Sequence, residues 1–138
     1  MTYFLQSQHH GFNQILKNVY VRLIEIEKGR IVTEMKLERD GCNIYDNLHG
    51  SMSALLIDVI STLALRSHFE AEDNPPPNSV SVELSLSFLA SIPLGNTVLL
   101  ETDLLKIGKN IAFLKGNIFD KETGKLACTG KHTKFLMR

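Results

Sequence analysis

The sequence lacks the features that would place it outside the ordinary globular proteins. Its 138 residues contain no tryptophan, two cysteines and four prolines, and 15 basic residues balance 15 acidic ones. The distant cysteines, Cys42 and Cys128, form no CxxC pattern and are typical of reduced thiols or core residues. A net charge of +0 argues against a nucleic-acid-binding protein, so any basic site has to be a local patch.

The sequence also shows no pattern typical of a targeting segment or a membrane span. The first ten residues lack a basic stretch followed by a long apolar one, so we expect no secretory signal peptide. The apolar run from Leu55 to Leu65 contains Asp58 and is too short to span a bilayer, so we expect no integral membrane association. The expected compartment is the cytoplasm, with the mitochondrion as the alternative because no acidic residue precedes Glu25.

What is present predicts one folded domain over residues 1–138. The hydrophobic share of 43% and the charged share of 22% are close to the globular average, and the chain is long enough to bury a sizeable core. Residues 1–19 form an N-terminal helical segment that Gly11 interrupts. The other expected elements are strands at 20–27 and 31–37, a helix at 50–69, and strands at 79–88, 96–107, 111–119 and 125–136.

Short turns between the strands imply antiparallel pairing. We therefore predict an α+β fold in which a sheet of about six strands wraps round one long central helix. The strand at 79–88 alternates most clearly, with its valines, leucines and phenylalanine on one face and its serines on the other. If the apolar set covers the helix, Ser81 points away from it, toward a site between subunits or toward solvent.

One carboxylate, Asp58, lies in the middle of the apolar helix. Its helical stripe is small and partly polar, and another stripe is large and apolar, so the first can admit a ligand or a partner. The two stripes are Ser51, Ala54, Leu55, Asp58, Ser61 and Thr62, and Met52, Leu56, Val59 and Leu63. A buried charge is costly without compensation. The residues alone leave two readings open, a structural hydrogen bond and a catalytic carboxylate.

The start of the same helix is the second candidate feature. Gly50 lets a ligand oxygen approach the first backbone amides, which have no intrahelical partners and carry partial positive charge. Such a helix start can form an oxyanion hole for acyl transfer. The alternative reading of His49 and Gly50 is an ordinary junction between a loop and a helix.

The stretch from Asn43 to Thr62 has the pattern N-x5-H-G-S-x6-D-x2-S-T. Together with S-V-S-V-E-L and the ending G-K-L-A-C-T-G-K-H-T-K, it resembles the hotdog-fold acyl-CoA thioesterases. Within them it looks closest to the phenylacetyl-CoA-thioesterase-like subgroup and its animal thioesterase superfamily member two proteins. The resemblance covers most of the chain and implies the same fold that the order of elements predicts.

The resemblance also implies a set of catalytic residues. Asp58 matches the carboxylate that acts as general base or nucleophile, and Asn43 an asparagine that orients the attacking water. Gly50 matches the amide that polarises the thioester carbonyl, His49 the histidine beside it, and Ser81 a serine that supports the carboxylate or water. In the family these residues come from two subunits of a homodimer, and dimers commonly pair into homotetramers.

The resemblance further implies acyl-CoA as substrate, with no metal and no cofactor. Many relatives carry a second glycine where this chain has Ser51, a departure that affects substrate preference more than activity. The anionic CoA tail calls for a local basic patch, although single lysines at strand ends are as often only solvated. The candidates for it are Lys106, Lys109, Lys131, His132, Thr133 and Lys134.

Three functions are compatible with this sequence. The leading one is hydrolysis of acyl-CoA to a carboxylic acid and CoA by a homo-oligomer, which the joint presence of Asn43, Asp58 and Ser81 favours. The second is a non-catalytic acyl-CoA or lipid-binding hotdog protein. The third is a hotdog dehydratase, whose histidine base belongs at a different position from His49.

Overall fold

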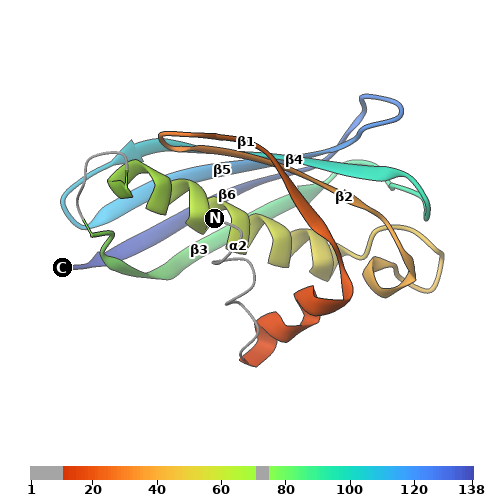
Figure 1. Ribbon diagram of the computed structural model, residues 1–138, viewed down its shortest axis with the longest axis horizontal. Helices are drawn as coiled ribbons and strands as arrows, with labels where there is room; N and C mark the ends of the chain where they lie inside the picture. Colours follow the sequence, from red (N-terminus) through yellow and green to blue (C-terminus); the bar gives the residue numbers. More distant parts are fainter. Residues whose placement is uncertain (1–10, 71–74) are drawn as a thin grey trace.

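The protein, seen in a computed structural model that describes residues 11–70 and 75–138, is one antiparallel sheet wrapped round one long helix (Figure 1). The elements are η1 (Gly11–Asn18), β1 (Val21–Glu27), β2 (Arg30–Lys36), η2 (Arg39–Gly41), α2 (Gly50–Glu70), β3 (Asn78–Phe88), β4 (Thr97–Ile107), β5 (Ile111–Asp120) and β6 (Leu126–Met137). The strand order is β1-β2-β4-β5-β6-β3. The predicted α+β hotdog arrangement is confirmed.

Each predicted strand and the central helix are present, with ends that differ by one residue at most. Of the predicted N-terminal helical segment, the structure shows the 3-10 helix η1, which begins at Gly11 in the left-handed region, with a φ of 61°. Residues 1–10 lie outside the described part of the chain. The η1 helix stands apart from the sheet, near the first turns of α2 (Figure 1).

The helix α2 is the core of the molecule. Its predicted apolar stripe is confirmed, because all four residues are at most 7% exposed. These residues are Met52, Leu56, Val59 and Leu63. By length and composition α2 would also suit a membrane, but 72% of its most apolar window is buried inside this fold. The burial of α2 by the sheet accounts for its hydrophobicity.

Two glycines of the sheet let the middle of α2 come very close to it. A Cβ atom at Gly116 of β5 would lie 3.0 Å from Cγ2 of Ile57, and one at Gly130 of β6 would lie 3.3 Å from its Cδ1. Real side chains rarely pack so tightly. The absence of side chains at these two positions therefore fixes how near the helix lies to β5 and β6.

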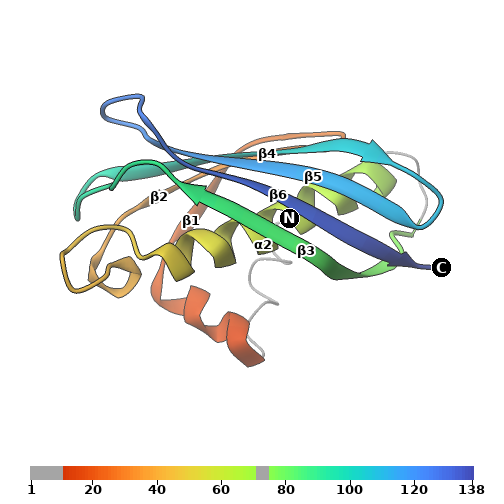
Figure 2. The same ribbon diagram turned by 180° about the vertical axis from the view of Figure 1, so that it is seen from behind.

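One edge of the sheet is the strand β3. It runs back beside β6 after the helix, and Figure 2 shows it along one margin of the sheet, below β6. Among the described residues, β3 pairs with β6 alone, so its outer side presents unpaired backbone donors and acceptors. The exposed valines Val80 and Val82 lie on this strand, 47% and 61% exposed. An edge of this length is a ready surface for pairing with another strand.

The prediction that the residues of β3 alternate regularly along 79–88 is wrong. A bulge between Ser81 and Glu83 shifts the register, so Ser81 pairs with Lys134 while Glu83 pairs with Thr133. One extra residue in a strand exchanges the faces of the residues on either side of it. Leu84 and Leu86 pack on the core as predicted, but Val80 and Val82 are exposed and Ser81 turns toward the helix side.

Substitution of Gly116 tests the close approach of the helix. In Gly116→Ala the new methyl group would press on Ile57, so we expect the free energy of unfolding to fall by about 1–3 kcal/mol. The measurement is chemical denaturation of wild type and variant. Gly108→Ala is the matched control, because its Cβ would meet only the Ile111 carbonyl oxygen at an ordinary 3.5 Å. Equal stability of the two variants would contradict this account of the packing.

Candidate active site around Asp58

Asp58 lies at the margin of the core, with its side chain 44% exposed. Its neighbours on α2 are Ser61 and Thr62, whose hydroxyl groups donate to the Asp58 carbonyl oxygen at 3.3 and 2.8 Å. Its neighbour on the sheet is His132, whose Nε2 lies 3.7 Å from Oδ1 of Asp58. The carboxylate thus reaches solvent on one side and a polar group of the sheet on the other.

His132 connects the helix to the edge strand. The ring is 1% exposed, and its Nδ1 lies 2.8 Å from the Ser61 hydroxyl while its Nε2 lies 2.7 Å from the Ser81 hydroxyl. A neutral imidazole donates from one ring nitrogen and accepts at the other, so both bonds form at once. The ring therefore holds Ser81 on the side of the strand that faces Asp58.

Lys134 is the second basic group of the cluster. Its side chain is 5% exposed, and Nζ donates to the Thr62 hydroxyl oxygen at 2.9 Å. The same hydroxyl group donates to Asp58, so an unbroken chain of hydrogen bonds runs from the ammonium to the backbone of the carboxylate residue. Charged groups this buried are rare unless paired or hydrogen-bonded.

Burial and the neighbouring charges decide the protonation of this cluster. Burial lowers the pKa of His132 to about 4, with a further lowering by Lys134 that the Asp58 carboxylate opposes. The imidazole is therefore neutral at neutral pH. Burial also lowers the pKa of Lys134 from its ordinary value, and Asp58 again opposes the change by raising it.

The start of α2 carries the other predicted residues. The backbone carbonyl of His49 accepts the first helical bond from Ser53, and its ring Nδ1 accepts from the Ser51 amide at 3.0 Å. His49 therefore caps the helix. The amide of Gly50, one of the amides with no intrahelical partner, bonds no acceptor in the described part of the chain. Gly50 also has a structural role, because a Cβ there would lie 3.3 Å from the Phe88 ring.

Asn43 shapes the loop before the helix. Its side-chain oxygen accepts from the amides of Tyr45 and Asn47 at 2.9 and 3.2 Å, and its backbone amide bonds the Asn47 carbonyl. This is the local turn for which asparagine is favoured. The NH2 group is then the part of the side chain that can donate to a substrate.

Within one chain these residues form two separate groups. Asp58, Ser81, His132 and Lys134 lie round the middle of α2, whereas Asn43, His49 and Gly50 lie at its start. Eight residues of helix separate Gly50 from Asp58, which corresponds to about 12 Å along the axis. One thioester carbonyl cannot contact both groups of the same chain.

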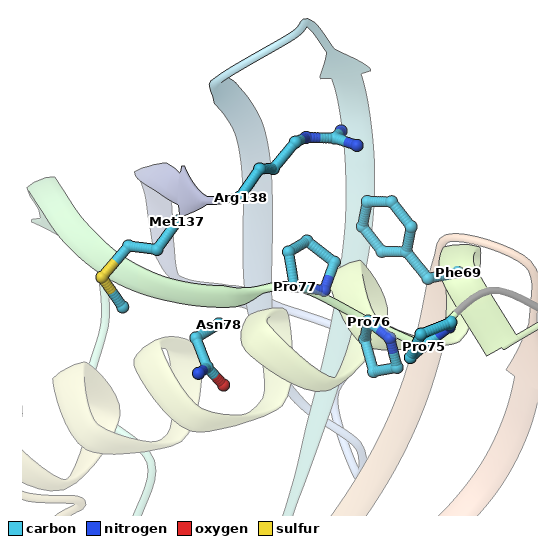
Figure 3. A pocket seen from close by; sticks show the side chains of 7 residues that line it. All are labelled: Phe69, Pro75, Pro76, Pro77, Asn78, Met137 and Arg138. Atoms are coloured by element: carbon cyan, nitrogen blue, oxygen red, sulfur yellow. The ribbon is translucent and has the colours of Figure 1, made fainter.

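Hollows border the Asp58 stripe of α2 at both ends. One, of about 170 Å³, lies between η1 and the helix start and is lined by residues that include Phe12, His49, Ser51 and Leu55. Another, of about 310 Å³, begins at Thr62 and runs along Leu65 and Ser79. Beside it lies a third, of about 600 Å³. In Figure 3 its lining residues Phe69 and Pro75 lie on one side, and Met137 on the other.

The six residues predicted to bind CoA do not form one patch. His132 and Lys134 are buried and face the helix, so the prediction that they belong to a basic surface is wrong for this chain. Lys131 and Thr133 occupy the intervening positions of β6, on the outer face of the sheet. Lys106 and Lys109 are exposed near the tip between β4 and β5.

Sequence reasoning missed the partnership of Asp58 with these two basic residues. The signal was present in β6, where positions 128, 130, 132, 134 and 136 share one face. Three of them, Cys128, Gly130 and Leu136, are small or apolar and typical of a core. His132 and Lys134 are even-numbered like these three residues, so the alternation alone predicts that they lie on the same face, toward the helix.

The buried His132 makes stability depend on pH. In the unfolded chain its pKa is 6.5 and in the folded protein about 4, so below pH 6.5 the unfolded chain binds the extra proton. Stability is therefore lost as the pH falls. We expect the titration of His132 to lower the free energy of unfolding by about 3 kcal/mol between pH 7 and pH 4.

The measurement is urea denaturation of wild type and His132→Gln at several pH values. Gln keeps a donor and an acceptor but does not titrate. The variant should therefore lose about 3 kcal/mol less than wild type over the same range. Parallel stability curves for the two proteins would contradict the depressed pKa.

Comparison with known proteins identifies the family. Residues 45–127 match the family model described as the thioesterase superfamily. The chain is 35% identical to acyl-coenzyme A thioesterase 13 of Homo sapiens over 130 residues, which cover 94% of this chain and 88% of that protein. The mouse protein of the same name is 34% identical, with 91% and 85% covered.

Among solved structures, zebra fish thioesterase superfamily member 2 superimposes with a TM-score of 0.86 at 31% identity. The match covers 98% of this chain and 94% of that one. With both the sequence and the fold in agreement, the chain belongs to the thioesterase superfamily.

Proposed function

We propose that this protein hydrolyses acyl-CoA thioesters, with Asp58 as the group that activates water. The observation that carries the proposal is the environment of Asp58, a half-exposed carboxylate backed by a buried layer of hydrogen-bonded polar groups. The relatives named acyl-coenzyme A thioesterase 13 support the substrate class.

In the proposed reaction, the Asp58 carboxylate takes a proton from a water molecule as the water oxygen attacks the thioester carbon. The Ser81 hydroxyl, held by His132, positions that water. The tetrahedral intermediate then collapses, the carbon–sulfur bond breaks, and the leaving thiolate receives the proton from Asp58. The products are a carboxylic acid and CoA, and no metal ion takes part in these steps.

The helix start would polarise the carbonyl. The Gly50 amide points out of the first turn of α2 and donates to the developing oxyanion, a contribution of about 3 kcal/mol by analogy with other oxyanion donors. The NH2 group of Asn43 lies in the loop beside it and donates to the water or to the carbonyl. His49 caps the helix and fixes the position of that first turn.

Because about 12 Å of helix separates Gly50 from Asp58, the proposed site needs two chains. Two β3 edges that pair antiparallel about a two-fold axis would continue the sheet and place the Phe88 end of one strand opposite the Asn78 end of the other. Phe88 lies against Gly50, whereas Ser81 lies on the Asn78 side of the bulge, near Asp58. The pairing thus brings one chain's helix start toward the other's carboxylate.

The hollows at the two ends of the Asp58 stripe suit a thioester, because its acyl chain and its pantetheine arm leave the carbonyl in opposite directions. Lys106, Lys109, Lys131 and Thr133 lie on the outer face or at the hairpin tip, where they would contact the anionic nucleotide. These four residues are the part of the predicted basic patch that remains at the surface. We further propose that dimers pair into a tetramer.

The main competing function is a non-catalytic hotdog protein that binds acyl-CoA or lipid. Such a protein has no need of a solvent-exposed carboxylate that is backed by a layer of buried basic groups. The presence of Asp58 with Ser81 held toward it therefore favours hydrolysis over binding alone.

Hydrolysis of a panel of acyl-CoAs, from short to long and aromatic, tests the proposal. We expect wild type to hydrolyse part of the panel, and Asp58→Asn to lose at least about a hundredfold in kcat, the usual scale for a positioned general base. The measured quantity is the free thiol of the CoA that hydrolysis releases. A wild type that binds CoA but hydrolyses none of the panel would refute the enzyme, and full activity of Asp58→Asn would make the carboxylate structural.

A mixture of two inactive variants tests the shared site. Asp58→Asn and Asn43→Ala are each expected to be inactive. A mixed dimer, however, contains one intact site, in which the chain with Asp58→Asn supplies Asn43 and the chain with Asn43→Ala supplies Asp58. Equal co-expression should restore about a quarter of wild-type activity, because about half of the dimers are mixed and each carries one intact site. Absence of any recovery, with mixed dimers confirmed by mass spectrometry, would place both residues in one chain's site.

A further inference from the structure

We infer that Lys134 is a positioning residue for the reaction, the buried cation that holds the Asp58 turn of α2 through Thr62, and does not belong to the CoA-binding surface. The inference rests on the proposed function, since it concerns how the carboxylate that activates water is held in place. It is carried by the burial of the lysine and by its hydrogen bond to the helix.

The position of the ammonium group is fixed by the helix. Lys134 Nζ donates to Thr62 Oγ1 at 2.9 Å, and Thr62 Oγ1 donates to the Asp58 carbonyl oxygen at 2.8 Å. With only 5% of the residue exposed, the lysine cannot reach a phosphate on the outer face of the sheet. Its charge is therefore directed into the space between β6 and α2.

The elements packed round Lys134 contribute few other charges. Its strand neighbours are Ala112 of β5 and Ser81 of β3, and neither is ionisable. Asp58 of α2 and His132 of β6 are the titratable groups that interact with it. Further along α2, Arg66 lines the hollow next to Thr62.

These charges give Lys134 a specific task. His132 is neutral at neutral pH, because burial lowers its pKa to about 4. It cannot balance the negative charge of Asp58, so the buried cation of this cluster is Lys134, which is bound to the Asp58 turn of the helix through Thr62. In a partly buried site the attraction between opposite charges is stronger than in water, and the bond to Thr62 holds the ammonium against the turn of helix that carries Asp58. The lysine thus acts through Asp58, and does not contact the reacting atoms.

Lys134→Met removes the charge and keeps an unbranched apolar side chain that fills the same space. We expect kcat to fall about tenfold or more, a part of the 10²–10⁴ that a positioned base contributes. The KM and the inhibition by free CoA should remain unchanged. Lys125→Met is the matched control, an exposed lysine before the other end of β6, and it should retain wild-type kcat.

The opposite pattern would overturn the inference. If Lys134→Met raised KM and weakened inhibition by CoA while kcat stayed the same, the lysine would bind the nucleotide. If the variant had the kinetics of wild type, Lys134 would have no part in the reaction. Thermal unfolding of each variant establishes that folded protein is compared.

The titration of His132, followed by NMR, tests the electrostatic part without any activity. In Lys134→Met its pKa should rise above the wild-type value of about 4, and in Asp58→Asn it should fall further, because the two charges act on this ring in opposite directions. A lysine whose charge did not act on this cluster would leave the titration of His132 unchanged in Lys134→Met. If wild type proved inert toward acyl-CoA, these shifts would still be measured, and an unchanged titration in Lys134→Met would overturn the inference.

Discussion

The contact of Ile57 with the two glycines of the sheet sets the geometry on which the rest of this molecule depends. Because Gly116 and Gly130 have no side chains, the middle of α2 lies directly on β5 and β6. The next residue along the helix is Asp58, and the next alternate positions along β6 are His132 and Lys134. The same close packing that completes the core therefore brings the carboxylate to 3.7 Å from the His132 ring and lets Lys134 bind the same turn of helix through Thr62.

This arrangement replaces apolar packing with polar groups in part of the core, at some cost in stability. The cost is limited because hydrogen bonds connect the members: Ser61 and Ser81 to the imidazole, and Thr62 to the ammonium. Removal of one member would leave its partner buried and unsatisfied, which is more costly than the loss of one bond. The cluster therefore functions as a unit, and its rigidity is what positions Ser81 and Asp58.

The sequence is enough to predict the order of the elements, the role of α2 as the core helix and the apolar stripe that it buries. These depend on local periodicity, which a single sequence records. The predicted face of Ser81 is wrong because one extra residue in β3 reverses the alternation, and the hydrophobic pattern of Val80, Val82 and Leu84 looks regular across the bulge. The prediction of a surface position for Lys134 is wrong because lysine usually lies there, and only its contact with Thr62 reveals its burial.

The bulge in β3 also changes what an insertion or deletion would mean. In a regularly alternating strand, the loss of one residue moves the side chains on one side of the deletion to the opposite face of the sheet. Here, loss of the extra residue at Val82 would instead remove the bulge and leave Ser81 opposite Lys134, on the side that faces the helix. In evolutionary terms, a single-codon deletion at Val82 would keep the Ser81 hydroxyl group within reach of His132, whereas a substitution of Ser81 would remove that group.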